Sequence, residues 1–207
     1  MIRLARGAEP AILSANKQRW TDEFKSGIDR RRYAHNDIKQ ALRTDAHEKC
    51  AYCESRVEHV SWPNVEHIVP KSREPDLVCD WDNLTIACEV CNTKKGDYYE
   101  PDCMIVHPFD DDPSEHIGWA GPMAIARSND RGRATITTID LNRSALLFER
   151  SQHFKVVFDL LDLISNNSGP VARAAQIDLD AYLAADSPYS AATGRFVVSQ
   201  TSGTEAS

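Results

Sequence analysis

Six cysteines occur in this 207-residue chain, and four of them fall into two Cys-x-x-Cys pairs, Cys50 with Cys53 and Cys88 with Cys91. Each pair can span one edge of a tetrahedron from a tight turn, so the four thiolates predict a closed, structural Zn²⁺ site. The 34 residues between the pairs exceed the usual spacing of a simple zinc ribbon. We therefore expect a folded insert inside the zinc clamp. The other two cysteines, Cys79 and Cys103, are expected to be ordinary thiols.

The insert carries a second set of polar residues, Glu66-His67, then Asn83, then Asn92. With the flanking VEHIVPKS, WDNL and CEVCNTKKG, over about 48 residues, the stretch resembles the HNH nuclease family in its ββα-metal, zinc-containing form. The resemblance implies that Glu66 and Asn92 hold one divalent cation, that His67 is the general base, and that Asn83 braces the loop carrying the histidine. Glu66 stands where Asp is more usual, and Asn92 where His is, which leaves the exact metal position open.

The chemistry of phosphodiester hydrolysis accounts for these residue types. A neutral imidazole can take a proton from water near pH 7, and a hard cation can neutralise charge on the phosphate and the leaving oxygen. Carboxylate and amide oxygens suit catalytic Mg²⁺ or Mn²⁺ better than zinc. Three lysines lie close enough in sequence to contact neighbouring phosphates: Lys71, Lys94 and Lys95.

These residues need an α+β fold to position them. We expect a ββα-metal module at residues 44–103, an N-terminal helical segment at 1–43, a C-terminal region of hairpin and helices at 104–186, and a mobile tail at 187–207. The predicted helices span 11–27, 29–43, 92–98, 144–164 and 171–184. The predicted strands span 57–62, 64–69 and 83–87, with a further hairpin of 123–127 and 134–139 over the turn 129–132.

Composition limits the function. The formal net charge is −7, although residues 1–43 carry ten Lys/Arg against five Asp/Glu. A domain that binds nucleic acid alone is usually strongly basic, so contacts are expected to be local or aided by a partner. We find no secretory signal and no membrane span, and six cysteines without export favour metal binding over disulfides. The cytoplasm is the expected compartment.

The flanks extend the resemblance, weakly, over residues 1–160. Glu9-Pro10, Trp20, Tyr33 and Leu141-Asn142-Arg143 are similar to the HNH subunit of Septu-type and retron-associated anti-phage systems. That likeness implies an ABC/SMC-like, PtuA-like ATPase subunit as partner and a nucleic acid as substrate, with DNA favoured. Two alternatives stay open: an RNase acting on tRNA, and a non-catalytic zinc-stapled assembly module.

Overall fold

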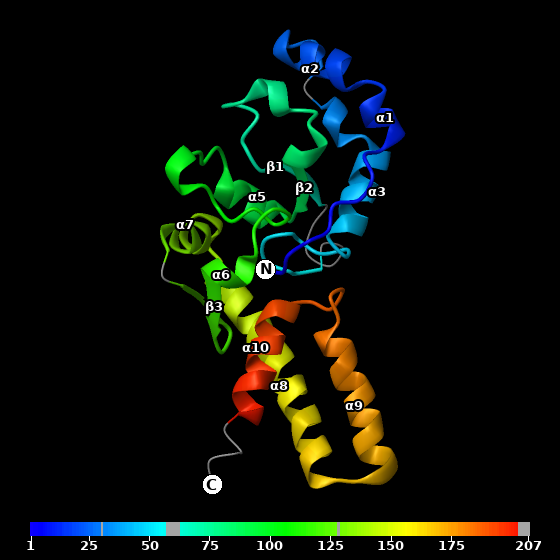
Figure 1. Cartoon of the computed structure of the whole chain (residues 1–207), viewed down its shortest axis with the longest axis vertical. Helices are drawn as coiled ribbons and strands as arrows, with labels where there is room; N and C mark the ends of the chain where they lie inside the picture. Colours follow the sequence, from blue (N-terminus) through cyan, green and yellow to red (C-terminus); the bar gives the residue numbers. More distant parts are fainter. Residues whose placement is uncertain (30, 57–62, 128, 203–207) are drawn as a thin grey trace.

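A computed structural model describes residues 1–29, 31–56, 63–127 and 129–202 of the chain (Figure 1). Within these residues the fold combines helices with two small antiparallel sheets, β1–β2 and β3–β4. The expected α+β class is confirmed. The strand expected at 57–62 lies outside the described residues.

The central module has the predicted order of strand, strand and helix. β1 (Asn64–His67) pairs with β2 (Leu84–Ala87), so that Glu66 lies opposite Thr85 and His67 opposite Leu84. The loop between them contains two 3₁₀ turns, η2 (Pro75–Leu77) and η3 (Trp81–Asn83). α5 (Glu89–Lys95) follows, beginning three residues before the expected start at 92 because the Cys88 side chain caps it by accepting from the Cys91 N–H.

The N-terminal segment packs on this module through an apolar core. It contains α1 (Ala11–Ser14), α2 (Lys17–Lys25), the 3₁₀ turn η1 (Arg32–Ala34) and α3 (Asn36–Asp45). The helix predicted over 11–27 is thus divided at residues 15–16. The one predicted over 29–43 begins seven residues late, because the His35 imidazole accepts from the Asp37 N–H and caps α3 there. Buried side chains join this segment to both strands: Leu13, Trp20, Ile38, Leu42, Val65 and Ile86.

The predicted hairpin of 123–127 with 134–139 is wrong. β4 (Met123–Ala126) pairs instead with β3 (Ile117–Ala120), and residues 130–139 form the helix α7 (Asp130–Ile139). The turn residues at 129–132 have other roles. The Asn129 side chain caps α7 by accepting from the Gly132 N–H at 2.8 Å. Gly132 permits close packing, since a Cβ there would lie 2.1 Å from the His116 carbonyl oxygen.

Two shorter elements connect the module to this sheet: η4 (Pro101–Cys103) and α6 (Pro113–His116). The acidic stretch at 110–113 forms contacts within the fold. Asp111 pairs with the Arg131 guanidinium, and Asp112 caps α6 by accepting from the Ser114 N–H. The first contact holds the connection against α7, and the second starts α6.

Three helices form the C-terminal end of the molecule (Figure 1). α8 (Ser144–Asn166) and α9 (Gly169–Leu183) are the two helices expected there, and they pack side by side as an antiparallel pair. The tail expected to be mobile from residue 187 is instead the helix α10 (Ser190–Thr201). Its Phe196 ring stacks on Phe154 of α8 at 4.6 Å, and its small residues Ala192 and Thr193 are buried. No helix of the described residues is long and apolar enough to cross a membrane.

Candidate active site and metal centre

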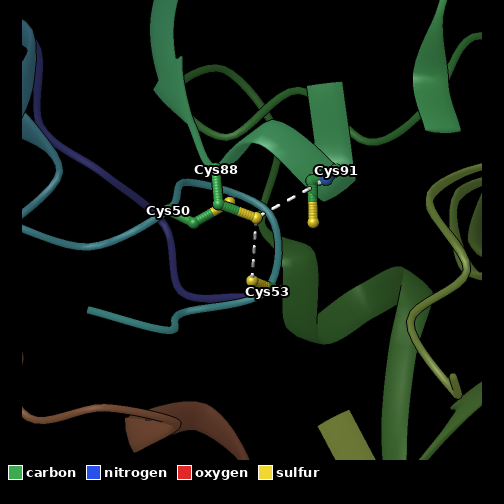
Figure 2. A group of neighbouring side chains, drawn as sticks. All are labelled: Cys50, Cys53, Cys88 and Cys91. Carbon is green, nitrogen blue, oxygen red and sulfur yellow. Dashed lines mark hydrogen bonds between the residues drawn. The ribbon is translucent and has the colours of Figure 1, made fainter. Parts of the chain in front are cut away.

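The four predicted cysteine ligands meet at one point (Figure 2). Cys50 and Cys53 come from the turn after α3, Cys88 caps α5, and Cys91 lies in its first turn. All four are buried, and their sulfurs lie within 4.8 Å of one another. The Sγ atoms of Cys53 and Cys88 are 3.9 Å apart.

This donor set fits a tetrahedral ion. A zinc–sulfur bond of about 2.3 Å implies sulfur–sulfur edges of about 3.8 Å in a regular tetrahedron. The observed spacing is close to that value, and four thiolates leave no open coordination position for a substrate. The cluster is thus suited to a structural ion that fastens the Cys50 turn to α5.

Glu66 lies near the end of β1 and is almost completely buried, at 3% exposure. Its Oε1 lies 2.7 Å from the Lys95 Nζ, and the Tyr52 hydroxyl donates to the same oxygen at 3.5 Å. Burial raises the pKa of Glu66 above its ordinary value, although Lys95 and Lys71 act in the opposite direction. The carboxylate is therefore held by few donors for its depth.

His67 follows on the same strand and is equally buried. Its Nε2 lies 3.0 Å from the Val78 carbonyl oxygen, and its ring meets the Tyr33 ring at 4.6 Å, nearly perpendicular. Burial, together with the nearby charges of Lys71 and Lys95, lowers the pKa of His67 to about 3. The imidazole is thus neutral at physiological pH.

Asn83 connects the two ends of the loop between β1 and β2. Its Oδ1 accepts from the Val69 N–H at 2.7 Å, while its Nδ2 donates to the carbonyls of Val69 at 3.0 Å and Leu77 at 3.2 Å. Three bonds from one side chain fix the backbone on both sides of the contact between His67 and Val78. These three hydrogen bonds suit the bracing role that the sequence resemblance implies for Asn83.

The three predicted lysines occupy different environments. Lys71 lies over the Tyr33 ring, with Nζ 5.4 Å from the centroid. Lys94 is half-exposed and pairs with Asp140 at 2.9 Å. Lys95 is buried, at 3% exposure, and donates to the His67 carbonyl at 2.7 Å as well as contacting Glu66, so its ammonium group is held by protein acceptors.

Glu66 and His67 are consecutive on a strand, so their side chains leave it on opposite faces. The structure gives them different immediate partners, but the same two cations, Lys71 and Lys95, act on the pKa of both. Asn92 is half-buried on α5, one turn before Lys95 and on the same side of the helix. Lys95 thus ties the helix that carries Asn92 to the end of β1.

Two contacts were missed by sequence reasoning. Tyr33 covers the His67 ring from a segment outside the HNH-like stretch. The sequence gave Tyr33 only as part of the wider resemblance, with no role in the site. Tyr52 stands between two metal-ligand cysteines, where its ring is completely buried and its hydroxyl reaches Glu66.

The central module matches a known protein family. Residues 50–98 match the HNH endonuclease family, and they contain the cysteine cluster, β1, β2 and α5. The module formed by these residues therefore belongs to the HNH endonucleases, a class of nucleases.

Within that class, the chain is similar to two curated proteins, each named Septu protein PtuB. One, from Bacillus thuringiensis, is 31% identical over 172 residues, which cover 80% of this chain and 66% of the relative. The other, from Bacillus mycoides (strain KBAB4), is 26% identical over 198 residues, covering 73% of this chain and 66% of the relative. The chain thus spans just under two thirds of the length of these relatives.

Proposed function

We propose that this chain is a metal-dependent endonuclease that hydrolyses phosphodiester bonds of DNA, with structural Zn²⁺ on Cys50, Cys53, Cys88 and Cys91. The observation that carries the proposal is the environment of His67. A histidine fixed by one hydrogen bond, and following the buried Glu66 directly in the same strand, is suited to general-base catalysis.

The hydrogen bond also selects the reactive nitrogen. The Val78 carbonyl only accepts, so Nε2 must carry the proton in the neutral ring. The lone pair is then on Nδ1, which is the atom that would take a proton from water. Asn83 keeps Val78 in place by fixing the neighbouring Leu77 carbonyl, so we assign it a positioning role.

Glu66 and Asn92 are the residues we propose to hold Mg²⁺ or Mn²⁺. In the described part of the chain, both bonded contacts of the Glu66 carboxylate fall on Oε1, so Oε2 keeps its acceptor capacity. The bound ion would supply charge neutralisation at the phosphate and the leaving oxygen. Lys71 and Lys94 are the proposed phosphate contacts, while Lys95 orients Glu66.

The partner is part of the proposal. Both curated relatives carry the name Septu protein PtuB, so we propose that this chain acts in an anti-phage defence complex with an ABC/SMC-like, PtuA-like ATPase subunit. Its net charge of −7 supports delivery of substrate by another subunit. We place the docking surface within residues 104–186, where α8 and α9 expose large apolar side chains, among them Phe148, Phe158 and Ile177.

The test is cleavage by the protein assembled with the product of the neighbouring gene, using plasmid DNA and total tRNA with Mn²⁺ or Mg²⁺. We expect His67→Ala to lower the rate of DNA cleavage at least about 100-fold, the usual contribution of a general base. Lys39→Ala, on α3 and outside both the site and the proposed docking region, is the control and should cut normally. Zinc content and melting temperature verify that each variant is folded.

Three outcomes would contradict the proposal in different ways. Cleavage by His67→Ala at the wild-type rate would exclude the general base. Degradation of tRNA with DNA left intact would favour the RNase. Protection of cells from phage by the His67 variant would favour the non-catalytic module.

A further inference from the structure

A groove of about 780 Å³ lies beside the candidate active site. Its walls come from α2, η1 and the loop after β1, and its main lining residues are Phe24, Lys25, Arg31, Tyr33, Lys71 and Ser72. Tyr33 connects it to the site, because the same ring lines the groove and contacts His67. Most of this wall lies outside the HNH-family residues 50–98.

The groove differs in charge from the rest of the chain. Three of its lining residues, Lys25, Arg31 and Lys71, are cationic, and none is acidic. The whole chain, in contrast, has 31 acidic against 24 basic residues. Lys25 pairs with Asp76 at 2.5 Å, but both side chains are largely exposed. Surface pairs of that kind contribute little, so a phosphate can replace the carboxylate.

Two aromatic side chains, Phe24 and Tyr33, stand among these cations. The Lys71 ammonium lies 5.4 Å from the centre of the Tyr33 ring, so a cation and an aromatic face are adjacent within one wall. Sites for single-stranded nucleic acid combine these two features, because cations contact the backbone and rings stack on unpaired bases. The volume is within the range of pockets that hold a small ligand, so a nucleotide can enter.

We propose that this groove binds an unpaired nucleotide of the substrate strand, adjacent to the phosphate on which His67 acts. The base lies against Tyr33, and the backbone phosphates contact Lys71 and Arg31. This inference rests on the proposed endonuclease function and adds to it a substrate contact made by the N-terminal segment. Since Tyr33 also covers His67, the nucleotide occupies the entrance to the reactive side chain.

Binding of a fluorescent oligodeoxythymidylate to the full zinc-loaded chain tests the proposal, measured by anisotropy without Mg²⁺ or Mn²⁺ so that no cleavage occurs. We expect Tyr33→Ala to weaken the single-strand complex about tenfold, the lower range of one base–aromatic stack. Tyr33→Phe should bind as wild type, because it keeps the ring. Arg31→Glu should weaken binding more steeply at low salt than at high salt.

Lys155→Ala is the matched control for loss of a lysine and should bind as wild type. Wild-type affinity in both Tyr33→Ala and Arg31→Glu would overturn the proposal, as would a wild-type chain that does not bind the oligonucleotide at low salt. If the groove variants lose affinity equally for a duplex of the same length, the proposal that the groove binds an unpaired nucleotide is rejected. Lys71→Ala gives a second measurement if Tyr33→Ala does not fold.

The failure of this inference can be separated from failure of the endonuclease. If the groove variants bind normally and His67→Ala no longer cuts, the proposed groove is rejected and the proposed nuclease function stands. Groove variants that lose binding, while His67→Ala still cuts, would leave a nucleic-acid site and remove the assigned base.

Discussion

Two buried lysine–glutamate pairs lie in this protein, and their glutamates behave in opposite ways. Lys49 pairs with Glu54 at 3.2 Å beside the cysteine cluster, and Lys95 pairs with Glu66 at 2.7 Å in the candidate active site. All four side chains are at most 4% exposed. Burial raises the pKa of Glu66, whereas the pKa of Glu54 is lowered to about 2.

The number of donors explains the difference. Burial alone would raise the pKa of Glu54, but the Met1 amino group and the Lys49 ammonium outweigh it. Donors reach both of its oxygens: Met1 N at 2.6 Å, Lys49 Nζ at 3.2 Å, Ser190 Oγ at 2.8 Å and Ala191 N at 3.3 Å. Among the described residues, the donors to Glu66 are Lys95 at 2.7 Å and the more distant Tyr52 at 3.5 Å. A carboxylate with donors on both oxygens stabilises the fold. A carboxylate with a free acceptor oxygen can bind a ligand.

Removing the metal from the cysteine cluster should have the largest effect, because both pairs depend on the elements it fastens. Cys91→Ser, or a strong zinc chelator, is expected to unfold the central module, since structural zinc supplies on the order of 10 kcal/mol in small zinc domains. Zinc content and thermal unfolding measure the effect. Cys103→Ser, outside the cluster, should change stability by less than about 1 kcal/mol. Unchanged melting after complete zinc removal would contradict a structural role.

Glu54→Gln should be the next largest. It leaves the Lys49 ammonium buried without its counter-charge, which typically costs about 3–5 kcal/mol. Urea unfolding at neutral pH gives the free energy directly, with Glu100→Gln as an exposed glutamate control. A loss below about 1 kcal/mol would remove the distinction between the two pairs.

Glu66→Gln should lower cleavage more strongly than it lowers stability. Glu66→Gln also leaves a buried lysine, Lys95, without its counter-charge. Because burial raises the pKa of Glu66 but the pKa of Glu54 is lowered, we expect the replacement of Glu66 to cost less stability than that of Glu54. Cleavage, in contrast, should fall at least about 100-fold as the metal ligand is lost. Unfolding and plasmid nicking on the same preparations test both parts. Full activity in this variant would place the ion elsewhere.

The smallest effect is stabilisation by the catalytic ion. Mn²⁺ at about 10 to 100 times its dissociation constant should stabilise the wild-type chain by about 1.4 to 2.7 kcal/mol. The increase in melting temperature should disappear in Glu66→Gln and shrink in Asn92→Ala, while Glu100→Gln should keep it. An equal increase in all four proteins would point to binding outside the site.

The metal centre and the core of the site were predictable from sequence because their signals are local. Cysteine spacing defines two turns, and the β-branched residues Val65, Ile68 and Val69 predict a strand that ends before Pro70. These two inferences needed only neighbours within a few positions. The bracing role of Asn83 came from the resemblance to HNH nucleases and stays a prediction.

The missed features depend on contacts between distant segments. Lys95 is buried because Glu66 and the His67 carbonyl lie opposite it, which no local pattern shows. Residues 134–139, ATITTI, have strand propensity, but Asn129 caps a helix there and Thr135 satisfies both the Arg131 carbonyl and the Val106 N–H. Tertiary contacts therefore override local preference.

The hydrogen bonds between α10 and Glu54 limit how far this protein can be truncated. Ser190 and Ala191 reach a glutamate that lies 136 and 137 positions earlier in the chain. If residues 50–98 were expressed alone or inserted into another protein, the Glu54 carboxylate would lose these donors. The turn at Cys53 would then be exposed to solvent on that side. Any recombinant fragment meant to stay folded must keep its final helix.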